Sequence, residues 1–246
     1  FILLGVASIS GYIGSSAKKL VIHDYLEQRE KRYVKDLFGK YVTPEIRDQI
    51  LAGKIPLNGE RTEATVLIAD LSDFTPYVEK NSPEEVVKSL RMYFTAMQKS
   101  VRQHQGLVLQ YVGDEIVVAF GAPVACTDHA SKAMQAAMEM QKNLLDLNNT
   151  RAREGKQPFR HRIGIHTGEV LAGNTGSEDQ PSYTLIGDTV NIASRLQEFN
   201  KKRGTEVIFS TATREKIPDH IRVRKLESAR LKGITRPIGI FTFDSG

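Results

Sequence analysis

Residues 64–71 read Ala-Thr-Val-Leu-Ile-Ala-Asp-Leu, a mostly apolar run in which Thr, Val and Ile are β-branched. A run of this length and composition predicts a buried strand. The next signal is Ser82-Pro83-Glu84-Glu85, which combines an N-cap residue, a proline at the first helical position and two acids that suit the helix dipole. We therefore expect a helix from here to about Gln105, ended by Gly106.

The segment after this helix predicts a β-hairpin, because the apolar runs 107–111 and 115–120 flank Gly113-Asp114. A long helix over about 128–151 and a strand pair through Gly168 are expected next. The order β-α-β-β-α-β predicts an α+β fold of the ferredoxin-like type, an antiparallel sheet with helices on one face. Additions to this core are expected at the C-terminal end: a strand at 182–186, a helix at 189–200, and strands at 207–210 and 238–243.

The composition is that of a globular protein. The chain has 246 residues, of which 40% are apolar and 26% charged, enough for one domain or one domain plus an appendage. A single cysteine excludes an intramolecular disulfide and a cysteine-based zinc cluster, and it favours a reducing compartment. The net charge of +5 is too small to indicate a nucleic-acid partner. Residues 201–236 hold 11 basic and 4 acidic side chains, which form either a solvated surface or a basic wall near a phosphate chain.

The first residues have the character of a membrane segment. Residues 1–14 carry no charge, and Lys18 and Lys19 follow at once. Fourteen residues are too few to span a bilayer, so we expect 1–17 to be the end of a transmembrane helix, with the following part on the cytoplasmic side at the inner face of the plasma membrane. A tag-like tail and a buried strand are the alternatives. Residues 18–43 predict a linker or signalling helix, either a short parallel coil or an amphipathic helix on its own domain. The folded domain is then 44–246.

Two aspartates point to a metal site. Asp70 ends the first predicted strand and Asp114 sits in the predicted hairpin turn. In a β-α-β-β unit these two elements are sheet neighbours, so the carboxylates can meet at one edge of the sheet. Hard divalent cations prefer oxygen ligands, and the main-chain carbonyl of Leu71 can supply another. The alternative is that each aspartate only serves a turn.

Asn191 and Arg195 lie four residues apart on a predicted helix and therefore share a face. An amide and a guanidinium together can orient a ribose and neutralise phosphate charge, although either side chain can equally be a plain surface residue. Lys232 lies in the basic C-terminal run, where one lysine alone indicates little.

Four stretches, taken in order, resemble the motifs of class III nucleotidyl cyclases. They are the first-strand motif at 66–75, the hairpin motif at 110–115, the helix motif Tyr183 to Arg195, and Leu231-Lys232-Gly233, which is similar to the triphosphate-binding lysine motif. Residues 38–45 also resemble the lead-in of bacterial members. The resemblance covers about residues 38–243.

This resemblance implies a nucleotidyl cyclase, a phosphorus–oxygen lyase, and we expect an adenylate cyclase that converts ATP to 3′,5′-cyclic AMP and pyrophosphate. Two divalent ions per site, Mg²⁺ or Mn²⁺, would be held by Asp70, Asp114 and the carbonyl of Leu71. Asn191 would hold the ribose, Arg195 would stabilise charge on the α-phosphate, and Lys232 would bind the β- and γ-phosphates. The family's site lies between two catalytic domains, so the resemblance also implies a homodimer with two shared active sites, joined to an upstream membrane or sensor region.

The base-recognition positions depart from the family pattern. Adenylyl cyclases usually have lysine and guanylyl cyclases glutamate where this chain has Gln110; Thr184 is the partner position. A lysine only donates and a glutamate only accepts, whereas a glutamine amide can do either. We therefore expect ATP to be the substrate, with side activity on GTP. A guanylate cyclase, a catalytically silent nucleotide-binding signalling module and a diguanylate cyclase are the alternatives. A diguanylate cyclase would give no role to the Asn191–Arg195 helix or to Lys232.

Overall fold

The structure is a computed structural model that describes residues 59–177, 181–230 and 237–244. The predicted membrane segment 1–17, the predicted linker helix 18–43 and Lys232 lie outside the described residues. Among the residues that are described, no helix is long and apolar enough to cross a membrane.

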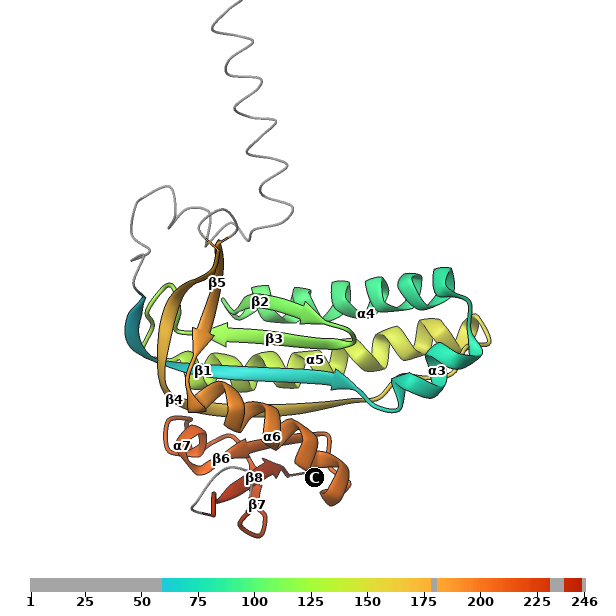
Figure 1. The fold of residues 1–246 in the computed structure, drawn as a ribbon. Coiled ribbons are helices and arrows are strands. Elements are labelled where there is room, and N and C mark those ends of the chain that lie inside the picture. The colour runs from blue at the N-terminus through green and yellow to red at the C-terminus, as the bar shows by residue number, and fades with distance from the viewer. Residues whose placement is uncertain (1–58, 178–180, 231–236, 245–246) are drawn as a thin grey trace, which may run out of the picture. The chain divides into compact units, whose positions relative to one another are not determined.

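The core of the fold is a four-stranded antiparallel sheet in the order β2-β3-β1-β4 (Figure 1). The chain runs through β1 (Glu60–Leu71), α3 (Phe74–Lys80), α4 (Pro83–Gln103), β2 (Leu107–Val112), β3 (Glu115–Phe120), α5 (His129–Arg153) and β4 (His161–Gly176). This order confirms the βαββαβ prediction; the short helix α3 was not predicted. β1 lies at the centre, paired with β3 on one side and β4 on the other.

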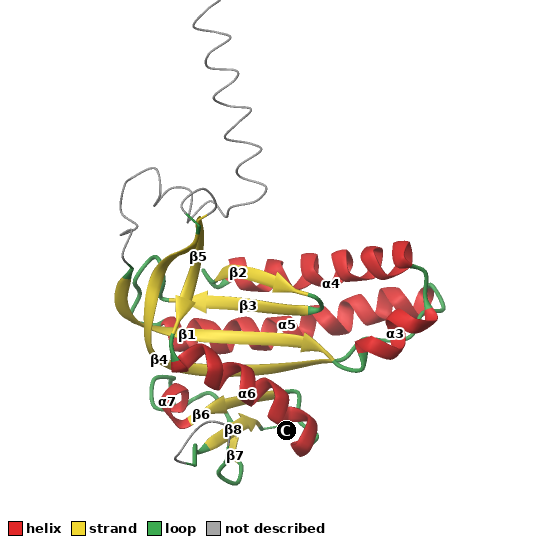
Figure 2. Ribbon diagram, viewed as in Figure 1, coloured by secondary structure: helices red, strands yellow, loops and turns green. Residues whose placement is uncertain are grey.

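The two helices of this core, α4 and α5, cover one face of the sheet, as predicted (Figure 2). Alternate residues of β1, among them Leu67, Ala69 and Leu71, are buried beneath them in the main hydrophobic core. The predicted start of α4 is also confirmed, because the main-chain N–H of Glu85 donates to the Ser82 side chain at 3.3 Å and Pro83 takes the first helical position.

The C-terminal part extends the sheet and adds a helix to its other face. It comprises β5 (Pro181–Ile186), α6 (Asp188–Arg203), β6 (Val207–Ser210), α7 (Thr211–Arg214), β7 (Val223–Lys225) and β8 (Ile240–Phe243). The sheet continues as β4-β6-β8-β7, and β5 pairs with β4. Because β4 and β6 are parallel, the complete sheet is mixed rather than antiparallel. α6 packs against β4 and β1 on the face opposite α4 and α5 (Figure 1).

The expected strand pair through Gly168 is wrong, since β4 is one strand that passes through that glycine without turning. Gly168 serves close packing instead: a Cβ atom there would lie 2.7 Å from the Thr189 hydroxyl at the start of α6. Gly164 allows the same close packing further along α6. A Cβ atom there would overlap the main chain of α6 at Ala193 and Gln197. Both glycines let α6 lie directly on β4.

Candidate active site

The structure brings Asp70 and Asp114 together at one end of the sheet. Asp70 is the penultimate residue of β1, and Asp114 belongs to the two-residue turn between β2 and β3. β1 and β3 are antiparallel neighbours with Ala69 opposite Ile116, so the turn lies beside the end of β1. Gly113 supplies the left-handed backbone that this turn needs, with φ 62°. The two carboxyl groups are within hydrogen-bonding reach of each other.

The neighbourhood of this pair is acidic and partly shielded from water. Burial, followed by the hydrogen bond and the charge of Asp114, raises the pKa of the Asp70 carboxyl to about 7, against an ordinary value of 3.8. Burial and the charge of Asp114 also raise the pKa of Glu115. The nearby Arg162 lowers the pKa of Asp70, but its effect is the smallest of these.

A divalent cation fits the donors that the pair offers. Two carboxylates that repel each other, next to the main-chain carbonyl of Leu71, form an all-oxygen set of the kind that Mg²⁺ and Mn²⁺ prefer. A cation would also remove the repulsion that raises the pKa of Asp70. Within the described ranges, no group of three or more His, Cys, Asp or Glu side chains is placed to hold a metal. The fit therefore depends on the aspartate pair and the main chain.

Three side chains around the pair were not predicted from the sequence. The Gln197 amide donates to Oδ2 of Asp70 at 3.4 Å, from the side of α6. The charge of Arg162, opposite Asp70 in the β1–β4 register, acts on the Asp70 carboxyl. Tyr93 is completely buried near both aspartates, and its hydroxyl contacts Nδ1 of His161 at 3.2 Å. No pattern in the sequence singles out these three residues, because their placement depends on contacts between distant segments.

The helix residues predicted for ribose and phosphate lie on α6. Asn191 is exposed, and the Arg195 guanidinium is held by the Glu198 carboxylate of the same helix at 2.9 and 3.0 Å. Among the described residues, no hydrogen bond or ion pair joins Asn191 or Arg195 to the aspartate pair. Among these described residues, neither Asn191 nor Arg195 is thus bonded to the aspartates, although the charge of Glu198, the partner of Arg195, acts on Glu115 beside Asp114.

The two predicted base-recognition residues are also apart within the chain. Gln110 is exposed on β2, the edge strand, whereas Thr184 is half-buried on β5, which pairs with β4. Gln110 lies opposite Val117 of β3, while the neighbours Ile116 and Val118 belong to the core beneath α4 and α5. Because side chains alternate along a strand, Gln110 points to the same face of the sheet as Asp70.

A comparison with known protein families identifies the family to which this chain belongs. The sequence model described as "Adenylate and Guanylate cyclase catalytic domain" matches residues 58–243. The chain is a member of this cyclase family. The resemblance seen in the four motifs is thereby confirmed, and it extends over the whole described fold.

Individual relatives include cyclases of both substrate types. The chain is 39% identical over 181 residues to "Adenylate cyclase 1" of Rhizobium meliloti, covering 74% of this chain and 27% of that protein. Among solved structures, it is similar to the adenylyl cyclase CyaB from P. aeruginosa (30% identity, TM-score 0.72, 77% of this chain and 97% of that one). It is also similar to the guanylyl cyclase Cya2 (35% identity, TM-score 0.68, 75% of this chain and 92% of that one). The matched region covers 27% to 38% of the length of the first curated relatives.

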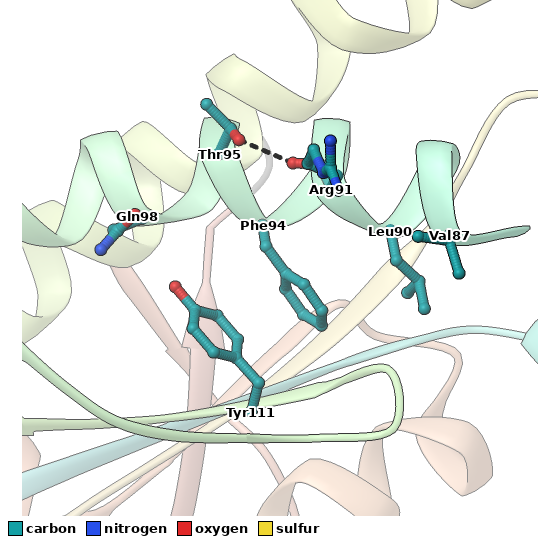
Figure 3. Close-up of a pocket in the computed structure, with 7 residues that line it drawn as sticks. All are labelled: Val87, Leu90, Arg91, Phe94, Thr95, Gln98 and Tyr111. Carbon is teal, nitrogen blue, oxygen red and sulfur yellow. Dashed lines mark hydrogen bonds between the residues drawn. The ribbon is translucent and has the colours of Figure 1, made fainter. Parts of the chain in front are cut away.

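The cyclase domain also carries a shallow hollow of about 330 Å³, lined by Tyr111 of β2 and by residues of α4 (Figure 3). Phe94 of α4 and Tyr111 of β2 line it and contact each other, with ring centroids 4.5 Å apart. Neither aspartate lines this hollow. It is therefore distinct from the group of side chains around Asp70 and Asp114.

Proposed function

We propose that this cyclase domain converts ATP to 3′,5′-cyclic AMP and pyrophosphate. The observation that carries the proposal is the approach of Asp70 and Asp114 at the end of β1, in a chain of the cyclase catalytic family. The relative named "Adenylate cyclase 1", 39% identical to this chain, supports ATP as the main substrate. In the reaction the 3′-oxygen loses its proton and bonds to the α-phosphorus, the bond from that phosphorus to the bridging oxygen breaks, and pyrophosphate leaves.

Asp70, Asp114 and the Leu71 carbonyl would hold two ions of Mg²⁺ or Mn²⁺ in each site. When bound, these ions would lower the pKa of the nucleotide 3′-hydroxyl and neutralise phosphate charge. The partly shielded end of the sheet, where Asp70 and Asp114 are half-buried, would limit the access of water to one side of the reacting atoms. As in other phosphoryl transfers, the remaining task of the protein is to position the substrate and to stabilise charge.

Three side chains would position the nucleotide and stabilise its charge. Asn191 would orient the ribose through its amide, and Arg195 would stabilise the charge that develops on the α-phosphate. Lys232 would bind the β- and γ-phosphates, which gives the basic C-terminal run a function. Arg195 is available for this role because its guanidinium is about two-fifths exposed and its partner Glu198 lies on the same helix surface.

The active site would be shared between two copies of the chain in a homodimer. Support comes from the described residues, in which neither Asn191 nor Arg195 forms a hydrogen bond or ion pair with Asp70 or Asp114 of its own chain. In a two-fold dimer the aspartates of one copy would face the α6 residues of the other, and two equivalent sites would result.

Gln110 and Thr184 would contact the base. Adenine presents an acceptor at N1 and a donor at N6, whereas guanine presents a donor at N1 and an acceptor at O6. A glutamine amide and a threonine hydroxyl can reorient to satisfy either base, so neither base leaves a buried group unpaired. The chain would therefore use GTP as a side substrate. Its similarity to the guanylyl cyclase Cya2 favours keeping GTP in the test.

The domain would lie on the cytoplasmic side of the plasma membrane, attached through residues 1–17 and joined to an upstream membrane or sensor region. Support comes from the uncharged residues 1–14 and from the lysines that follow them. Expression of the chain with and without residues 1–17 tests this. Only the longer form should sediment with membranes, and equal sedimentation of the two would contradict the attachment.

The activity is tested by incubating the purified dimer with Mn²⁺ and either ATP or GTP, with Asp70→Ala as the control. We expect cyclic AMP from the wild type, less cyclic GMP, and neither product from the variant. A dimer that binds nucleotide but forms neither product would indicate the silent signalling module instead.

A further inference from the structure

Gln197 occupies an unusual position for an amide on a helix. It is 4% exposed, and its side chain reaches across from α6 to the carboxyl group of Asp70, with Nε2 3.4 Å from Oδ2. Among the described residues, this is the one side-chain hydrogen bond that Gln197 makes. A buried amide is normally satisfied by main-chain groups nearby, so a single contact to a distant carboxylate indicates a specific purpose.

The contact exists because of the way α6 lies on the sheet. Gly164 of β4 faces the main chain of α6 at Gln197, with no room for a Cβ atom. Gly164 is opposite Ile68 in the β1–β4 register, two residues before Asp70 on the same face of β1. The close approach at Gly164 therefore fixes how near α6 lies to the sheet, and with it the position from which the Gln197 side chain reaches Asp70.

The remaining contacts of Asp70 show what the amide does for it. The carboxyl group meets Asp114, which repels it when both are ionised. It also accepts a hydrogen bond from Gln197, which carries no charge, whereas the charge of Arg162 affects it less than burial or Asp114 does. An uncharged donor fixes the rotation of a carboxylate without competing with a cation, whereas a lysine at this position would compete. A contact of 3.4 Å is long, as positioning contacts in ligand-free sites often are before they tighten.

We propose that Gln197 is a positioning residue for the metal-binding reaction centre: its amide holds the Asp70 carboxylate in the orientation that binds the divalent cation. This rests on the proposed metal-dependent cyclase function. Partners that orient a metal ligand typically contribute 10–100-fold to metal affinity. Gln197 acts through Asp70 and does not touch the nucleotide.

The test is Mn²⁺ binding to the full chain, measured by the loss of the electron paramagnetic resonance signal of free Mn²⁺. Every sample contains the same concentration of 3′-deoxy-ATP, which has no 3′-hydroxyl and cannot react, and a protein-free sample gives the amount of Mn²⁺ that the nucleotide itself binds. Gln197→Met keeps the length of the side chain without the donor, and Gln197→Asn keeps an amide that is too short to reach. Gln135→Met, on an exposed position of α5, is the matched control.

We expect both Gln197 variants to raise the Mn²⁺ dissociation constant by about 10–100-fold, with the control unchanged. In activity assays the kcat of both variants should return to the wild-type value at saturating Mn²⁺, with the KM for ATP unchanged. A merely structural defect would not be reversed by Mn²⁺.

Wild-type Mn²⁺ affinity in both variants, with weaker binding in Asp70→Asn, would overturn the role of Gln197 and leave the proposed function intact. If Asp70→Asn binds Mn²⁺ as tightly as the wild type, the metal site itself is wrong, and the inference falls with it. If the methionine variant fails to fold, the asparagine variant decides the outcome.

Discussion

Asp70 on β1 and Asp114 in the β2–β3 turn lie within hydrogen-bonding reach of each other at one end of the sheet. This relationship has a direct consequence for stability when no cation is present. The folded chain holds two carboxyl groups together, and the pKa of Asp70 is raised to about 7 from 3.8. Such a group stabilises the fold while it is protonated, and the stabilisation is lost as the pH rises through about 7.

We therefore expect Asp70→Asn to raise the thermal midpoint of the metal-free protein at pH 8. At pH 5, where Asp70 is largely protonated in the folded chain, the gain should be smaller. Thermal unfolding in EDTA at the two pH values measures the difference. The same substitution at Asp146, exposed on α5, should show no such pH-dependent gain. A gain that is larger at pH 5 would contradict the placement of the two aspartates.

Arg195 is expected to act on charge that develops during the reaction. Arg195→Ala should lower kcat by about 10²–10³-fold, as the loss of one charge-stabilising donor typically does. The KM for ATP should change far less, because the interaction strengthens in the transition state. Arg91→Ala, an exposed arginine of α4 beside the hollow, is the control and should keep its activity. Steady-state kinetics would speak against this role if KM rose with kcat unchanged.

Gln110 is expected to set how loosely the base is recognised. A lysine there can only donate, so Gln110→Lys should pair with the N1 acceptor of adenine and leave guanine unpaired. The ratio of kcat/KM for ATP to that for GTP should rise about tenfold, the value of roughly one net hydrogen bond. Gln98→Lys, on α4, adds the same charge away from the base and should leave the ratio unchanged. No rise in the Gln110 variant would refute this account of the pocket.

Gly164 is expected to be intolerant of any side chain, because a Cβ atom would overlap the main chain of α6 at Ala193 and Gln197. Gly164→Ala should lower the free energy of unfolding by about 1–3 kcal/mol through overpacking. It should also weaken Mn²⁺ binding, since α6 must move away from Asp70. Chemical denaturation and Mn²⁺ titration measure the two effects. Full stability with unchanged Mn²⁺ affinity would show that α6 does not depend on this contact.

Much of the fold could be predicted from local sequence signals. The apolar run 64–71, the Ser82-Pro83 helix start and the Gly113-Asp114 turn each specify one element, and their order leads to the ferredoxin-like core. The meeting of Asp70 and Asp114 follows from that topology, since β1 and the β2–β3 hairpin are neighbours. These features depend on residues that are close in the sequence or on a simple pairing rule.

The features that escaped prediction depend on contacts between distant segments. Gly168 has the sequence signature of a turn, yet it marks the place where Thr189 of α6 approaches β4. Gln197 has no recognisable pattern of its own, because its contact with Asp70 follows from a close approach that Gly164 permits. The parallel pairing of β4 with β6 and the short strand β7 likewise require the folded chain.

The most direct test of the shared active site is complementation between two inactive chains. Asp70→Ala removes the proposed metal ligand and Arg195→Ala removes the proposed phosphate contact, and each variant alone should form almost no cyclic AMP. In a mixed dimer, one of the two sites would combine the intact Asp70 of one chain with the intact Arg195 of the other. An equal mixture that exchanges subunits at random should therefore regain about a quarter of the wild-type rate. No regained activity, with mixed dimers demonstrated and the wild type active, would contradict a site built from two chains.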